Sequence, residues 1–267
     1  MKDPEFAGCW VKIDRARQHC VELERAANEW LETKPYRFRT DYDPVANVRV
    51  IRLEQAPIVP RDLCAIIGDA VHNLRASLDH FVYRIAVIES HQDPPPKAGK
   101  LAFPICVTKD VFDRRRQWLG DISAPMRASL EEFQPFRTHH VNPRESALWI
   151  LDELDIIDKH RDFPLALIQI GDRLVLKPSG PGIAIHGLAA PRPLEANAEF
   201  LVYSSEDPAV TLEFDPTFEI AFAKSDVLPE GHAVGAALET LARNVETVVG
   251  SARRAPGTAS SSPSSLG

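Results

Sequence analysis

The stretch between residues 60 and 91 constrains the fold of this chain more than any other feature. Pro60 suits the first turn of a helix, and the run Asp-Pro-Pro-Pro at 93–96 ends one. At about 3.6 residues per turn, its apolar side chains fall on a single stripe. The stripe consists of Leu63, Ile67, Ala70, Leu74, Leu78, Phe81, Ile85 and Ile88. The pattern predicts a long helix over 60–91 that packs against a core along one face.

The same period recurs along the chain, and Gly- and Pro-rich breakers separate the periodic segments. Alternating residues instead predict a hairpin over 36–55 and several short strands between 163 and 223. Helices and strands are therefore grouped, which is typical of an α+β fold. We expect a helical bundle core of three long and two or three short helices, an inserted β-hairpin, and a C-terminal antiparallel sheet followed by a last helix. The other predicted helices cover 9–34, 108–119, 124–134, 143–161 and 229–250.

These elements predict one α+β domain over residues 9–250. Its bundle covers about 9–161, and its sheet and last helix cover about 163–250. The Ser-, Pro- and Gly-rich segment 251–267 is expected to be a disordered tail.

Composition excludes several classes of protein. The net charge of −7 argues against non-specific binding to nucleic acid, although a local basic pocket remains compatible with it. No apolar run reaches the length of a membrane span and no signal sequence opens the chain, so we expect a cytoplasmic protein with no membrane partner. The four cysteines lack metal-binding spacing and are expected to be reduced core thiols. No glycine-rich phosphate loop is present, and we expect no cofactor.

Two polar rows flank the apolar stripe of the helix at 60–91. Residues His72, Arg75 and Asp79 form one row, and residues Asp69, Asn73 and His80 form the other. Exposed rows on helices usually carry Lys and Glu, whereas these side chains are short or planar and favour fixed hydrogen bonds. The rows indicate either a structural network that ties neighbouring helices together or a catalytic or ligand-binding site.

The helix at 143–161 is apolar almost all round, yet Asp155 and Asp158 lie in its most apolar sector. Burying a carboxylate costs several kcal/mol unless it is paired and hydrogen-bonded. The candidate partners are Arg75, His72 and His80, so we predict that the two helices face each other through a His/Arg/Asp cluster. Lys159, His160 and Arg161 follow in the last turn, where cations suit the helix C-terminus.

The sequence Gly-Asp-x-x-His-Asn-Leu-Arg-x-x-Leu-Asp-His at 68–80, with Asp-x-x-Asp-Lys-His-Arg at 155–161, resembles a set of uncharacterised bacterial proteins. The spacing of Arg75 and His80, with four residues between them, also resembles the HEPN superfamily of helical domains. Many HEPN proteins are metal-independent ribonucleases in which a dimer brings two such motifs together. This chain departs from the family in having Ala76 where a polar residue usually follows the arginine.

The resemblance to HEPN domains implies roles for particular residues. Arg75 would stabilise the charged phosphorane, and His80 would act as general acid or base. Together with them we assign His72 and Asp79 as candidate catalytic residues. The candidate binding residues are Asn73, Asp69, Asp155, Asp158, Lys159 and His160. The partners implied are RNA, bound through a local basic pocket, and a second copy of the chain.

Three functions therefore stand side by side. The first is a HEPN-like, metal-independent ribonuclease or toxin-type protein. The second is a metal-binding helical bundle with His72, His80, Asp155, Asp158 and His160 as ligands. The third is a non-catalytic interaction or small-ligand-binding protein whose polar cluster is structural.

Overall fold

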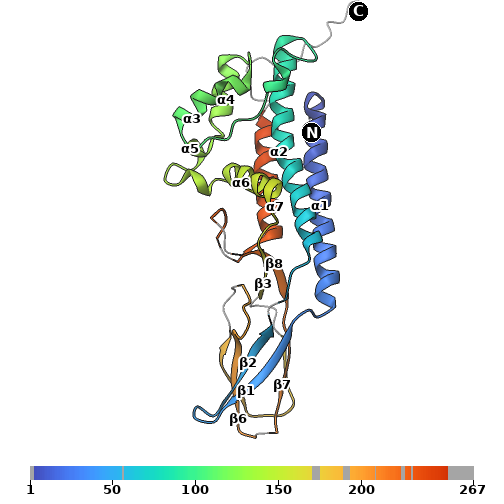
Figure 1. Cartoon of the computed structure of the whole chain (residues 1–267), viewed down its shortest axis with the longest axis vertical. Coiled ribbons are helices and arrows are strands. Elements are labelled where there is room, and N and C mark those ends of the chain that lie inside the picture. Colours follow the sequence, from blue (N-terminus) through green and yellow to red (C-terminus); the bar gives the residue numbers. More distant parts are fainter. Residues whose placement is uncertain are drawn as a thin grey trace, which may run out of the picture. The chain divides into compact units, whose positions relative to one another are not determined.

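The α+β fold predicted from the sequence is confirmed by the computed structural model of the chain (Figure 1). Helices form the start of the chain, most of the segment from Arg61 to His160, and Val234–Gly250, and the strands form antiparallel sheets. The residues described are 3–55, 57–169, 175–188, 193–207, 209–223, 226–229 and 231–251. Apart from Ser251, the predicted tail lies outside them.

The helices lie close to their predicted positions. The long ones are α1 (Ala7–Glu32), α2 (Arg61–Ser90), α6 (Ala147–His160) and α7 (Val234–Gly250). The short ones are α3 (Lys109–Arg115), α4 (Ala124–Glu131) and α5 (Pro135–Thr138). Short 3-10 turns are η1 (Pro4–Phe6), η2 (Ala98–Lys100), η3 (Arg116–Leu119) and η4 (Pro143–Glu145). None of the helices in the described ranges has the length and apolar character needed to cross a membrane.

The predicted helix over 143–161 is broken in two. Asn142 caps only the 3-10 turn η4, where its side chain accepts a hydrogen bond from the Arg144 amide. At Ser146 the backbone is extended, and the Ser146 hydroxyl accepts a hydrogen bond from the Trp149 amide at 3.2 Å. Ser146 is therefore the N-cap of α6, because a serine hydroxyl can satisfy an amide that the first helical turn leaves free.

The strands form three antiparallel sheets. The first has the order β1 (Arg37–Asp43), β2 (Val48–Gln55), β6 (Glu199–Ser205), β5 (Ile183–Leu188). The second has the order β3 (Leu165–Gln169), β8 (Phe218–Phe222), β9 (His232–Ala233). The third pairs β4 (Val175–Pro178) with β7 (Leu212–Asp215).

The predicted hairpin is not a separate insertion but half of the first sheet. Strand β2 pairs with β6, with Ile51 opposite Leu201. Val50, Ile51 and Leu53 of β2 are buried. An isolated two-stranded hairpin would leave such side chains and one row of backbone groups in water, so pairing with β6 and β5 stabilises it.

The described residues fall into two compact units. Unit 1 contains α1 as far as Cys20, the chain from Gly68 to His160, and α7 from Leu238. Unit 2 contains the rest of α1, the hairpin, the start of α2 as far as Ile67, and the chain from Arg161 to Ala237. Each unit is thus assembled from segments far apart in the sequence.

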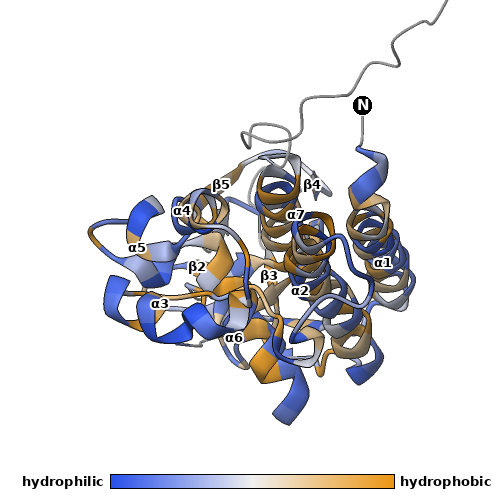
Figure 2. Cartoon of the chain, turned by 90° about the horizontal axis from the view of Figure 1, so that it is seen from above, coloured by the Kyte–Doolittle hydropathy of each residue, from blue (hydrophilic) through white to orange (hydrophobic). Residues whose placement is uncertain are grey.

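In unit 1 the parts of α1, α2 and α7 lie side by side. Figure 2 shows these helices end-on, with apolar residues on α2 and α7. The Ser77 hydroxyl of α2 donates to the Cys9 carbonyl of α1 at 3.0 Å. Arg17 of α1 forms an ion pair with Glu246 of α7 at 2.8 Å. The apolar stripe predicted on α2 is buried except for its last member, Ile88.

All four cysteines are free thiols, as predicted, and three of them are buried in the core. Cys9, Cys64 and Cys106 are buried, and Cys20 is partly buried. Burial raises the pKa of the Cys9 thiol to about 12 and that of Cys106 to about 11. Both therefore act as small apolar side chains rather than as nucleophiles.

Candidate functional site

Arg75 of α2 is the centre of a closed hydrogen-bond network in unit 1. Its Nε donates to Asp152 Oδ1 of α6 at 3.0 Å, and its Nη1 donates to Asp79 Oδ1 at 2.7 Å. Its Nη2 donates to the Phe103 carbonyl at 3.0 Å. The Phe103 amide in turn donates to Asp79 Oδ1 at 2.8 Å. One guanidinium therefore ties α2 to α6 and to the segment that leads into α3.

The Arg75 side chain is only 12% exposed and remains charged. Burial alone would lower the pKa of its guanidinium, but the carboxylates of Asp79 and Asp152 outweigh burial and raise that pKa. Each guanidinium nitrogen already donates a hydrogen bond. Two carboxylates next to one cation leave this network with a net negative charge, which is unfavourable for binding a phosphate.

One turn away, Asp155 of α6 is buried, with 4% of the residue exposed. Its Oδ2 accepts a hydrogen bond from the Lys159 ammonium group. Its Oδ1 receives no hydrogen bond from any described residue. Opposite it on α2 is the ring of His72, whose Nδ1 lies 3.6 Å from Asp155 Oδ1 and whose side chain is 59% exposed.

The carboxylate of Asp158 lies close to the backbone of α2 because Gly68 has no side chain. A Cβ at Gly68 would lie 2.0 Å from Asp158 Oδ1, far inside van der Waals contact. Partial burial raises the pKa of Asp158, and the negative charges of Asp155 and Asp69 raise it further. His72 and Lys159 oppose this shift without cancelling it. We call Asp69, His72, Asp155, Asp158 and Lys159 the acidic cluster.

The prediction that the two helices face each other is confirmed, but the pairing differs in detail. Arg75 binds Asp152, an acid that the sequence analysis did not single out, and Asp155 lies opposite His72. His80 lies beside α1 instead, because a Cβ at Gly8 would be 3.7 Å from His80 Nδ1. Residues 75 and 80 differ by about 140° around an ideal helix, so they face different elements.

The remaining candidates are placed less centrally. Asn73 donates to the Asp69 carbonyl at 2.8 Å, which is a contact within α2. Asp158 is exposed over most of its surface, contrary to expectation, because α6 is near its end there, and only its carboxylate is partly covered by α2 at Gly68. His160 is exposed, and its ring makes no hydrogen bond or ion pair with the part of the chain that the structure describes.

The metal-binding alternative receives no support from this geometry. Among the described residues, no three His, Cys, Asp or Glu side chains are grouped as a metal ion requires. Of the proposed ligands, His72 and Asp155 are close together, but His80 faces α1.

Comparison with known proteins adds no family. No family model matches the chain, and no curated protein and no solved structure matches it either. The resemblances to the bacterial set and to HEPN domains therefore remain predictions, and the site has to be interpreted from its own chemistry.

The first prediction concerns the tie made by Arg75. Arg75→Ala should lower the free energy of unfolding by about 3 kcal/mol, because it leaves Asp79, Asp152 and the Phe103 carbonyl without their shared donor. Urea denaturation measures this loss. Arg84→Ala is the matched control on the same helix: its partners Glu5 and Asp93 are exposed, so we expect a loss below about 1 kcal/mol. Equal losses would contradict the structural role of Arg75.

The second prediction concerns Asp158. Because its pKa is raised in the folded protein, the folded state holds a proton that the unfolded state has already released. Stability should therefore fall as pH rises from about 4, the usual carboxyl value, through the raised pKa. Asp158→Asn should remove this fall and be more stable than wild type at neutral pH, as measured by urea denaturation at several pH values. Glu24→Gln, an exposed position on α1, should leave the pH profile unchanged.

Proposed function

We propose that this protein is a binding protein whose acidic cluster recognises a ligand carrying an ammonium or guanidinium group. In this proposal the Arg75 network is structural and positions α2 against α6, while the acidic cluster contacts the ligand. It corresponds to the non-catalytic alternative among the three functions considered from the sequence.

The main support for the proposal is the missing hydrogen bond at Asp155 Oδ1. This atom is a buried carboxylate oxygen without a hydrogen-bond donor among the described residues. Leaving a buried acceptor unsatisfied costs about 1–3 kcal/mol, and more when the group is charged. A ligand N–H that reaches this oxygen recovers that energy on binding, so the protein carries an unmet requirement for a donor.

The charges around Asp155 favour a cation. Asp69, Asp155 and Asp158 contribute three carboxylates, against the single ammonium of Lys159 and the imidazole of His72. The pKa of Asp158 is raised first by partial burial and then by the charges of Asp155 and Asp69, which is consistent with this negative potential. Because no three side chains are grouped for a metal ion among the described residues, an organic cation with directional N–H donors fits better than a metal.

Isothermal titration calorimetry with agmatine and with spermidine tests the proposal and separates guanidinium from amine recognition. We expect saturable binding by wild type that weakens as salt is raised. Asp155→Asn should weaken binding about tenfold or more, since it removes the buried charge. Glu24→Gln is the control and should bind as wild type does. If Asp155→Asn does not fold, Asp158→Asn provides the same comparison.

Absence of saturable binding to both compounds, or unchanged affinity in both aspartate variants, contradicts the proposal. Circular dichroism of each variant shows whether a loss of binding merely reflects a loss of fold.

A second candidate is supported by the contact between His72 and Asp155. An exposed imidazole backed by a buried carboxylate has the arrangement of a general acid–base pair. A HEPN-like ribonuclease built on this chain would then use His72 within one copy, or Arg75 and His80 supplied across a homodimer, with RNA as the partner. The three carboxylates of the acidic cluster disfavour a polyanion, which places this candidate second.

RNA cleavage in the presence of EDTA tests the second candidate. Cleavage lost in His72→Ala but kept in His80→Ala supports a His72-centred site. Cleavage that requires His80 and Arg75 supports the dimeric arrangement implied by the resemblance. His139→Ala, an exposed loop position, is the control and should keep full activity. No cleavage by wild type at any chain concentration removes this candidate.

A further inference from the structure

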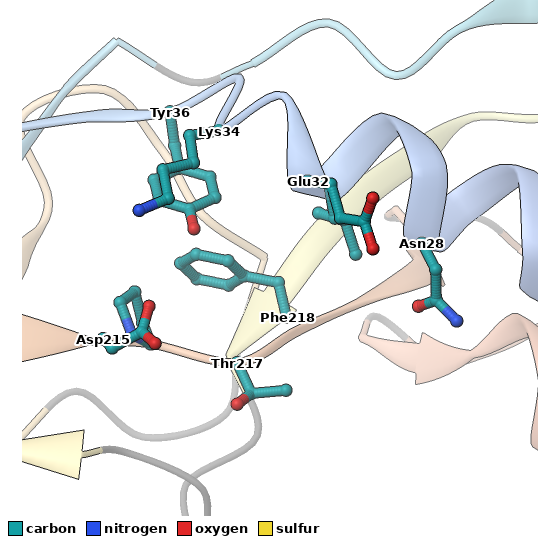
Figure 3. A pocket seen from close by; sticks show the side chains of 9 residues that line it. Asn28, Glu32, Lys34, Tyr36, Asp215, Thr217 and Phe218 are labelled. Carbon is teal, nitrogen blue, oxygen red and sulfur yellow. The ribbon is translucent and has the colours of Figure 1, made fainter.

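A hollow lies in unit 2, where α1 ends and β1 begins (Figure 3). None of the residues that line it belongs to the acidic cluster. Pro35 cannot continue the helix, and Lys34 adopts a left-handed backbone conformation with φ 51°. The opposite wall is the connection from β7 to β8, which runs from Asp215 to Phe218. The hollow has a volume of about 360 Å³, at the lower end of the range for small-ligand pockets.

Aromatic side chains form part of its wall. The rings of Tyr36 and Phe218 meet edge to face, with centroids 4.7 Å apart and planes inclined at 64°. Phe218 is buried and Tyr36 is partly buried, so the pair is held in place. Leu31 and Pro216 extend the apolar lining. The face of an aromatic ring carries negative charge density, which attracts a cation.

Carboxylates complete the lining. Figure 3 shows Glu32 and Asp215 on either side of the Phe218 ring. Neither carboxylate makes an ion pair or a side-chain hydrogen bond with any residue in the described ranges. Burial raises the pKa of the Tyr36 phenol, and the charge of Asp215 raises it further, which is consistent with a negative potential inside the pocket. Lys34, which is exposed, supplies the opposing charge at the rim.

We propose that this pocket binds a small alkylated ammonium ion, with the cation against the Tyr36–Phe218 pair and near the carboxylates of Glu32 and Asp215. Aromatic rings attract a weakly hydrated cation, and its alkyl groups can pack against Leu31, Pro216 and the two rings while the carboxylates balance its charge. Among the described residues no three His, Cys, Asp or Glu side chains are grouped for a metal ion, and the apolar and aromatic part of this wall suits an alkylated cation better. This site is independent of the acidic cluster, which requires N–H donors.

Choline and its uncharged isostere 3,3-dimethyl-1-butanol provide a matched pair of probes for the full-length protein. Titration followed by NMR should show saturable binding of choline, with the isostere bound about tenfold more weakly because it lacks the charge. Asp215→Asn, at an exposed position, should weaken choline binding several-fold. Lys34→Asn should strengthen it, since asparagine tolerates the left-handed backbone and removes the repelling charge.

Tyr36→Leu should weaken choline binding about tenfold, whereas Tyr42→Leu, an exposed tyrosine on β1, the strand that follows Tyr36, should not change it. If Tyr36→Leu fails to fold, the Asp215 and Lys34 variants still decide. Equal binding of choline and the isostere, no saturable binding of choline, or no change in the Asp215 variant overturns the proposal. Asp155→Asn must retain choline binding, which separates this result from that of the acidic cluster.

Discussion

The guanidinium of Arg75 holds three separate pieces of unit 1 in register. Its donors are fixed in one plane, so binding Asp152, Asp79 and the Phe103 carbonyl together restricts the rotation of α6 about its own axis against α2. That restriction carries over to the next turn, where Asp155 lies opposite His72. The acidic cluster thus inherits its geometry from a neighbouring network in which each guanidinium nitrogen is already engaged within the protein. Stability and binding are assigned to adjacent turns of the same two helices.

The elements that follow from local patterns were predicted well, and those that depend on distant partners were not. The stripe on α2 could be read from period alone, since each of its side chains meets the same core. The hairpin was located correctly, but its alternating residues do not indicate which strand pairs with β2 at Ile51. The residue opposite Ile51 is Leu201 of β6, about 150 residues later in the chain, and no local signal links the two.

For the site, the physical argument was sound but its assignment was partly wrong. A buried acid on α6 does face basic groups on α2, as the burial of Asp155 requires. Asp152 was not predicted as a site residue, because an aspartate on a partly exposed helix face carries no distinguishing signal by itself. A signal was present in the spacing: positions 72 and 75 on α2 match positions 155 and 152 on α6, running in opposite directions. Equal three-residue steps place both pairs in contact at once.

The assembly of each unit from distant segments has a consequence for the order in which the protein can mature. Strand β2 leaves the ribosome long before β6, with which it pairs. The start of α1 likewise leaves long before α7, whose Glu246 forms an ion pair with Arg17 of α1. Neither unit can close until nearly the whole chain has been synthesised. In that interval the apolar residues of β2 and α1 lack the partners that bury them in the folded chain, so apolar surface stays exposed during most of synthesis.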